Sequence, residues 1–333
     1  MFSMFYLKNM RDLTCLLAVL YTLRLSMATD GPLMERFFKR DYSLVQPYNG
    51  FSSYSSWDLK GTALVTAEYV RLTPDQPHRQ GAIWSQNPLL LYDWELKVHF
   101  KIHGRGKTYM AGDGFAIWLT KERMEDGHVF GSRNNFTGLG VFVDTFPNYK
   151  YGWMDDWDYP RVSVMLGNGI LSYDHDSDGR STELGSCSAK VRNSRDGAFI
   201  LIRYTQNRLK IMTAMRAVGG GDWIWEDCTN IAGVHLPAGN YLGASAATGE
   251  LSDYHDIISM KLYELTVDGG PKENLHTQRS DDKSELQDDF KEKHISGIQL
   301  LTLFFIILGL CALVAGGSKL YRRWEEKKRK RFY

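Results

Sequence analysis

The segment Trp94-Glu-Leu-Lys-Val-His-Phe-Lys-Ile102 decides the fold class, because its apolar and polar residues alternate over nine positions. Every second residue from Trp94 to Ile102 is large and apolar, whereas the residues between them are charged or, at His99, polar. A period of two over this length is typical of a β-strand with one face buried and the other in water. We therefore expect His99 to be a solvated histidine on the polar face.

Other segments with strand character continue this pattern on both sides. They are residues 115–119, 139–143, 241–247 and 257–267. Two hairpins are also predicted, 162–166 with 170–173 and 198–204 with 209–213, because their turn residues tolerate positive φ. No convincing amphipathic helix lies between residues 35 and 268. Many short strands in one long domain predict an antiparallel β-sandwich.

The composition is compatible with this fold and excludes some classes of function. The chain has 333 residues, of which 43% are apolar, so it can bury a large core. The 40 basic and 39 acidic side chains leave a formal net charge of +1. This balance argues against a protein that binds nucleic acid through bulk charge.

The two ends of the chain predict a membrane protein. Residues 1–28 combine basic residues, an apolar stretch and a small-residue end at Ala28, which is typical of a secretory signal; an uncleaved anchor is the alternative. Residues 295–317 carry no charge and would form a helix of about 34 Å, enough to cross a bilayer core of about 30 Å. The strongly basic segment 318–333 then lies in the cytoplasm by the positive-inside rule. We predict a single-pass type I protein with a lumenal domain at 33–268 and a polar stalk at 269–294.

Only two cysteines, Cys187 and Cys228, lie in the predicted lumenal part. Because that compartment is oxidising, we predict that they form a disulfide. Asn135 begins the N-glycosylation sequon Asn-Phe-Thr.

The first candidate binding motif is Val141-Phe-Val-Asp-Thr-Phe-Pro-Asn148. A predicted strand leads into Asp144, and a turn with proline returns Asn148 towards it. Carboxylate, amide and carbonyl oxygens are ligands that suit Ca²⁺. The alternative is an ordinary turn that Asp144 and Asn148 cap.

Three further loops are candidates, and for the last two an ordinary turn is the alternative. Asp174 to Gly179 begins like an EF-hand loop, but Gly185 stands where a bidentate glutamate is needed, so we do not expect an EF-hand. A loop that donates one carboxylate to a Ca²⁺ site built elsewhere is the open alternative. Asp113 lies between glycines that let the backbone approach a ligand closely. The loop 247–251 offers backbone N–H groups to hydroxyls. No hydrolase or nucleotide-binding motif is present in the sequence, so we do not expect an enzyme.

Taken together, these motifs resemble the L-type (legume-lectin-like) lectins of the early secretory pathway, and most of all their vesicular integral-membrane (VIP and VIP-like) branch. The motifs that carry the resemblance are Tyr69-Val-Arg-Leu-Thr-Pro74, Gly112-Asp-Gly-Phe-Ala-Ile-Trp118, Val129-Phe-Gly-Ser132, Phe142-Val-Asp-Thr145, Leu171-Ser-Tyr-Asp-His175, Leu251-Ser-Asp253 and His255-Asp-Ile-Ile-Ser-Met-Lys-Leu262. The resemblance implies a concanavalin-like jelly-roll sandwich and Ca²⁺-dependent binding of high-mannose N-glycans on cargo glycoproteins.

The resemblance also implies roles for individual residues. The implied metal ligands are Asp144, the carbonyl of Phe146, Asn148 and Asp178. The implied carbohydrate contacts are Asp113, Asn148, His175 and the backbone of Gly249, Glu250 and Leu251. Cys187 and Cys228 match the disulfide of the family. Because an unperturbed histidine such as His175 becomes charged near pH ~6.5, we expect weaker sugar binding at acid pH.

Two departures from the family lie at the expected sugar rim, where His78 replaces the usual serine and Glu250 the usual aspartate. They leave open a cargo adaptor that recognises polypeptide and has a degenerate sugar site; a sandwich-fold glycoside hydrolase is the third alternative.

In the tail, Arg329, Lys330 and Arg331 resemble a retrieval signal. Phe332 and Tyr333 resemble an export signal, which implies vesicle coat components as partners. The expected compartments are the ER, the ER–Golgi intermediate compartment and the Golgi, with a role in glycoprotein sorting, transport or quality control.

Overall fold

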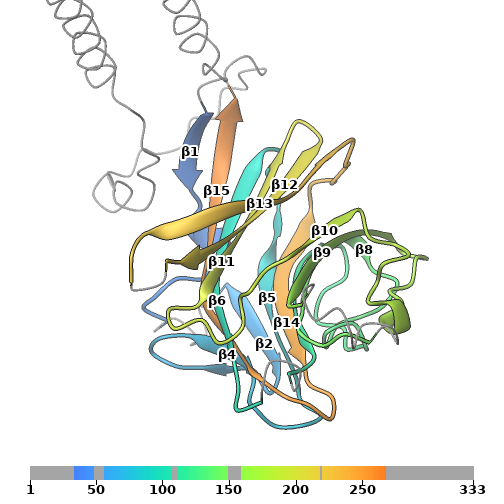
Figure 1. Cartoon of the computed structure of the whole chain (residues 1–333). Helices are drawn as coiled ribbons and strands as arrows, with labels where there is room; N and C mark the ends of the chain where they lie inside the picture. Colours follow the sequence, from blue (N-terminus) through green and yellow to red (C-terminus); the bar gives the residue numbers. More distant parts are fainter. Residues whose placement is uncertain (1–33, 49–55, 107–110, 149–158, 218–219, 268–333) are drawn as a thin grey trace, which may run out of the picture. The chain divides into compact units, whose positions relative to one another are not determined.

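The computed structural model describes residues 34–48, 56–106, 111–148, 159–217 and 220–267. These residues form two facing antiparallel sheets, which appear as two layers in Figure 1. The β-sandwich predicted from the sequence is therefore confirmed. In the described ranges the helical elements are two 3₁₀ turns, η1 (Arg40–Tyr42) and η3 (His175–Ser177).

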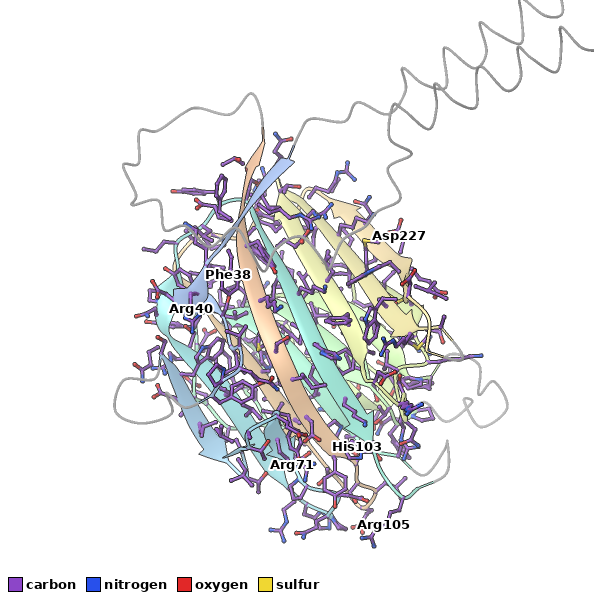
Figure 2. The ribbon with its side chains drawn as sticks, turned by 90° about the vertical axis from the view of Figure 1, so that its left-hand side faces the viewer. Phe38, Arg40, Arg71, His103, Arg105 and Asp227 are labelled. Atoms are coloured by element: carbon purple, nitrogen blue, oxygen red, sulfur yellow. A yellow bond between two sulfur atoms is a disulfide. The ribbon has the colours of Figure 1, made fainter. Side chains whose placement is uncertain are left out.

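The first sheet has eight strands. Their order is β13 (Trp223–Ala232), β12 (Arg208–Arg216), β11 (Ala198–Thr205), β6 (Trp94–His103), β15 (Tyr254–Val267), β4 (Val70–Thr73) and β3 (Leu64–Val65), and β1 (Met34–Phe38) also pairs with β15. Figure 2 views this sheet face-on, with His103 and Arg71 near one end and Phe38 towards the other. The hairpin of β11 and β12 was predicted correctly, and both of its turn residues, Gln206 and Asn207, have positive φ.

The second sheet has seven strands. Their order is β10 (Gly185–Ser188), β9 (Arg161–Asn168), β8 (Thr137–Asp144), β7 (Gly114–Thr120), β14 (Asn240–Ala247), β5 (Gln80–Leu89) and β2 (Trp57–Gly61). Its inner face packs against the eight-stranded sheet through the larger apolar core. Its outer face carries a second apolar cluster, which includes Trp84, Trp118, Phe130, Phe142 and Tyr173. Phe130 and Tyr173 belong to connecting segments, so this cluster fixes loops to the outer face of the sheet.

The strand that decides the fold is buried on both faces, not on one. Glu95 is 0% exposed and forms an ion pair with Arg203, and Lys97 is 4% exposed with its ammonium over the Phe199 ring. The prediction of a solvated His99 is wrong, because its ring is half-buried, stacks on Phe199 and lies 2.9 Å from the Asp196 carbonyl oxygen. Cross-strand partners therefore cover the face that the sequence marks as polar.

The hairpin predicted at 162–173 is also wrong. Strand β9 ends at Asn168 and pairs with β10 instead, while residues 170–173 form no strand. The Asn168 side chain accepts hydrogen bonds from the N–H groups of Ile170 and Leu171, so these N–H groups do not pair with a strand. The chain leaves the sheet here and enters the second apolar cluster at Tyr173, which leads it towards His175.

The predicted disulfide is present. Cys187 on β10 and Cys228 on β13 are bonded, and each of these strands lies at an edge of its own sheet. The bond therefore joins the two layers along one edge. It closes a loop with a sequence separation of 41 residues.

We expect the double substitution Cys187→Ala/Cys228→Ala to lower the free energy of unfolding by about 4 kcal/mol, since the unfolded chain regains the entropy of that loop. Urea unfolding of the wild type and of the variant, both with other thiols blocked, measures the difference. A loss below about 1 kcal/mol would contradict this chain-entropy account.

A second feature that governs stability is His255, a buried residue near the start of β15. It lies in the chain between Asp253 and Asp256, whose carboxylates are both paired with arginines. Its Nδ1 atom is 2.7 Å from Thr73 Oγ1, and its Nε2 atom has no hydrogen-bond partner among the described residues. Burial lowers the pKa of His255 to about 3, so the folded protein holds this ring neutral.

In the unfolded chain this histidine has a pKa of about 6.5, so it binds a proton at pH values at which folded His255 stays neutral. Below pH 6.5 the unfolded state therefore binds more protons, and this residue alone costs about 1.4 kcal/mol of stability for each pH unit. We expect the stability of wild type to fall more steeply between pH 6 and 4 than that of His255→Gln. Parallel profiles from denaturant unfolding at several pH values would rule this out.

Candidate metal and carbohydrate site

The register of the seven-stranded sheet gathers the predicted site residues at one end. Gly114, the first residue of β7, pairs with Asp144 at the end of β8 and with Ala247 at the end of β14. Asp144 in turn pairs with Arg161 at the start of β9, and Ala247 pairs with Gln80 at the start of β5. The segments that precede or follow these residues therefore emerge side by side.

Two of the predicted metal ligands are buried carboxylates. Asp144 is 5% exposed and Asp178 is 1% exposed. Asp144 Oδ1 accepts a hydrogen bond from the Phe146 N–H group at 2.9 Å, and Asp178 Oδ1 accepts one from the Asn148 N–H group at 2.8 Å. The turn-capping interpretation therefore holds for the Asp144 side chain, and the bond to Asp178 brings Asn148 beside a second predicted ligand.

Oxygen atoms converge at this turn in a way that fits a cation. The Asn148 Oδ1 atom is 3.3 Å from Asp178 Oδ1 and 3.3 Å from the Phe146 carbonyl oxygen, and all three are acceptors. With the amide turned over, its nitrogen would donate to both of these oxygens at the same distances. The amide can therefore serve either as a hydrogen-bond donor or, with its oxygen inwards, as a ligand beside two others.

The charges favour a cation as well. Burial raises the pKa of Asp144 well above its usual range; the hydrogen bond from Phe146 opposes this, and the neighbouring charges of Asp178 and Asp113 add to it. The charge of Arg161 acts in the opposite direction, but its guanidinium is hydrogen-bonded to Glu183. In the described ranges no group of three or more His, Cys, Asp or Glu side chains is placed to hold a metal. The site offers two carboxylates, an amide and a carbonyl, a set that suits Ca²⁺ better than a transition metal.

A cavity of about 240 Å³ lies next to these oxygens. It is lined by Asp113, His128, Phe130, Asp144, Phe146, Asn148 and His175. The predicted sugar contacts Asp113, Asn148 and His175 are thus brought together. Sequence reasoning missed His128 and Phe130 as lining residues, although Phe130 lies in one of the motifs that carry the family resemblance.

Asp113 is held at the cavity by both of its neighbouring strands. Its N–H donates to the Ala247 carbonyl at 3.2 Å, and its carbonyl accepts from the Thr145 N–H at 2.9 Å. Burial raises the pKa of its side chain, while a hydrogen bond from the Gly249 backbone and the charge of His78 lower it. A Cβ atom at Gly249 would lie 3.1 Å from Asp113 Oδ1, so glycine allows this close approach.

His175 presents an unpaired nitrogen atom. Its Nε2 atom is buried without a hydrogen-bond partner in the described structure, while the His128 backbone forms a hydrogen bond with the ring. That bond raises the pKa of His175, and Nε2 is the ring nitrogen left without a partner. Nε2 is then free to accept a hydroxyl. Burial has the larger effect and lowers the pKa of His175, contrary to the unperturbed value assumed from the sequence.

The two residues that depart from the family, His78 and Glu250, contact each other at the rim of the proposed sugar site. The His78 N–H donates to the Gly249 carbonyl at 3.0 Å, and His78 Nε2 is 3.4 Å from Glu250 Oε1. Both side chains are exposed, Glu250 to 90%. Neither they nor Gly249 and Leu251 line the cavity, so the structure places this part of the predicted sugar site beside the pocket rather than in it.

Several predicted features are not tested by the structure. Asn135 precedes β8 at the opposite end of the sheet, where its Nδ2 donates to the Ile170 carbonyl; its glycosylation stays a prediction. The segments 1–28, 269–294, 295–317 and 318–333, with the signals at 329–333, lie outside the described residues. Within the described ranges no helix is both long and apolar enough to cross a membrane.

Comparison with known proteins agrees with this geometry. The chain is 47% identical over 305 residues to the human VIP36-like protein, covering 89% of this chain and 86% of that one. It is 41% identical over 320 residues to the dog vesicular integral-membrane protein VIP36, covering 92% and 87%. The crystal structure of the VIP36 exoplasmic/lumenal domain in its Ca²⁺/Man2-bound form matches with a TM-score of 0.65 and 48% identity, over 70% of this chain and 92% of that chain.

A family model described as the legume-like lectin family matches residues 35–270, which include both sheets and every residue of the described site. This chain therefore belongs to the legume-like lectin family.

Proposed function

We propose that this protein is a Ca²⁺-dependent lectin that binds high-mannose N-glycans of glycoproteins through the 240 Å³ cavity. The observation that carries the proposal is the convergence of three acceptor oxygens, from Asn148, Asp178 and Phe146, beside a cavity lined by Asp113 and His175. The VIP36 lumenal domain, which is similar in sequence and fold, has been crystallised in Ca²⁺/Man2-bound and Ca²⁺/Man3GlcNAc-bound forms, and this supports the proposal.

Each polar group in the cavity has a defined task in this function. Bound Ca²⁺ would be held by Asp144, Asp178, Asn148 and the Phe146 carbonyl and would fix the loops that form the pocket. With its oxygen turned towards the metal, Asn148 directs its amide nitrogen elsewhere, as a donor to a sugar hydroxyl. The Asp113 carboxylate and His175 Nε2 accept hydrogen bonds from hydroxyls. Phe130 and Phe146 offer apolar surface to sugar C–H groups.

The cellular role is proposed on the same basis. Relatives carry the names vesicular integral-membrane protein VIP36 and protein ERGIC-53, which supports a membrane protein of the ER, the intermediate compartment or the Golgi. We place the lectin domain in the lumen, with the span at 295–317 and the tail signals at 329–333 engaging vesicle coat components. Sorting, transport or quality control of glycoproteins then follows from glycan binding on one side of the membrane and coat binding on the other.

The alternatives make different predictions. Lectins bind carbohydrates without chemical turnover, so membership of this family confirms the prediction that the chain is not an enzyme. A cargo adaptor that reads polypeptide would keep its cargo after the glycans are removed. The proposed lectin would release it.

Removing Ca²⁺ should abolish sugar binding, because the buried carboxylates would then repel each other and the Asn148 amide could turn over. Titration calorimetry of the full chain in detergent, with mannose oligosaccharides, should show at least a tenfold loss of affinity on chelation, as expected when a metal orients the binding groups. Equal affinity in calcium and in chelator would refute the mechanism.

Two variants distinguish a residue that binds the metal from one that binds the sugar. Asp178→Asn should lose the rise in melting temperature that CaCl₂ produces, whereas Asp113→Asn should keep that rise and lose sugar binding. Asp176→Asn is the matched control, because Asp176 is exposed and lies only two residues from Asp178. A loss of sugar binding in this control would show that the charge of the whole loop, not one ligand, is responsible.

The rim residues should affect oligosaccharides more than mannose itself, because His78 and Glu250 lie beside the cavity. For Glu250→Gln we expect mannose affinity to change less than about twofold and trimannose affinity to change at least about threefold, the scale of one rim hydrogen bond. Glu264→Gln is the control, because Glu264 is a half-buried carboxylate on β15 of the other sheet and is paired with Lys39. Equal factors for the two sugars would place Glu250 in the monosaccharide subsite instead.

A further inference from the structure

Tyr159 lies directly behind the proposed metal site, two residues before the start of β9. Its hydroxyl donates to Asp178 Oδ2 at 2.5 Å, a length typical of a hydrogen bond from a hydroxyl to a carboxylate. The other oxygen of Asp178 accepts the Asn148 N–H at 2.8 Å. Two different segments of the chain therefore donate hydrogen bonds to the two oxygens of the Asp178 carboxylate and set its orientation.

The hydroxyl of Tyr159 is itself oriented by a cation. The side chain of Arg180, two residues after Asp178, forms a hydrogen bond with it, so the phenol accepts from a guanidinium and donates to a carboxylate. Burial, followed by the bond to Asp178, raises the pKa of Tyr159, so the phenol keeps the proton that it donates. A guanidinium placed directly on Asp178 would bring a positive charge to the cation site. The Tyr159 hydroxyl is instead polarised by the guanidinium and donates a stronger hydrogen bond to Asp178, while the positive charge stays one group further away.

We propose that Tyr159 is a positioning residue for Ca²⁺, which holds the Asp178 carboxylate in its ligating orientation through the hydrogen bond from its hydroxyl. The inference rests on the proposed calcium site and adds a residue that none of the sequence motifs contains. Hydrogen-bond partners of metal ligands commonly change metal affinity by 10- to 100-fold. Tyr159 is not one of the residues that line the cavity, so its effect on sugar should arise only through the metal.

The test uses Tyr159→Phe in the full chain purified in detergent, titrated calorimetrically with CaCl₂ alone. Removing one hydroxyl should weaken Ca²⁺ binding by about tenfold. In saturating CaCl₂ the affinity for mannose oligosaccharide should stay within about twofold of wild type, since Asp113 and His175 are unchanged. The matched control is Tyr204→Phe, which removes a buried hydroxyl bonded to Asn207 and the Val234 carbonyl on the other sheet and should leave Ca²⁺ affinity unchanged.

A purely structural tyrosine would lower the melting temperature of the calcium-free protein and leave the Ca²⁺ affinity as in wild type, and that result would overturn the proposal. Arg180→Gln, an exposed substitution, is a second variant that decides the matter if Tyr159→Phe does not fold; it should weaken Ca²⁺ binding by about two- to threefold, as loss of polarisation predicts. Wild-type protein that binds no Ca²⁺ would overturn both this inference and the proposed function. Wild-type protein that binds Ca²⁺ but no mannose would overturn the proposed function alone.

Discussion

The burial of two carboxylates next to each other is the constraint on which the functional end of this molecule depends. Asp144 and Asp178 are almost fully removed from water, and the charge of Asp178 adds to the cost of ionising Asp144. Arg161, a cation whose charge acts on Asp144, is hydrogen-bonded to Glu183 and Ser186. Such an arrangement is unfavourable by itself. It would become favourable if a divalent cation joined the carboxylates to the neighbouring amide and carbonyl oxygens, as we propose.

The sandwich maintains this arrangement by anchoring two of the described segments that reach it. The loop from β14 to β15 is fixed at one end by the pairing of Ala247 with Gly114 and at the other by the buried ion pair of Asp253 with Arg192. In its middle, the Gly249 carbonyl accepts the His78 N–H from the neighbouring loop. The outer apolar cluster holds the segment around Phe130 in the same way. Rigid walls of this kind would reduce the entropy lost if a flexible glycan were ordered in the pocket, as we propose.

The sequence predicted the sandwich and most of its central strands, because their apolar periodicity is a local property. It failed where a partner far away in the sequence decides the outcome. Glu95 and Lys97 look solvent-exposed from alternation, yet Arg203 and the Phe199 ring cover them from a strand about a hundred residues later. The error after Asn168 has another origin, since its side chain, not a partner strand, takes the next N–H groups. Short edge strands such as β10 and β3 carry too few residues to show a period at all.

The same distinction explains what was found at the site. Asp144, Phe146 and Asn148 lie within five residues, so their chemistry is visible as a motif, and the family resemblance added Asp178 and His175 from a distant segment. The hydroxyl of Tyr159 and the backbone of His128 become visible only when strand register brings them to these side chains. A group that positions a binding residue need not be recognisable in the sequence, because a phenol or a backbone carbonyl has no pattern that distinguishes it from structural residues. The orientation of Asp178 and the contacts of the His175 ring therefore belong to the fold rather than to any motif, and we expect changes at Tyr159 to alter metal affinity while every predicted ligand remains in place.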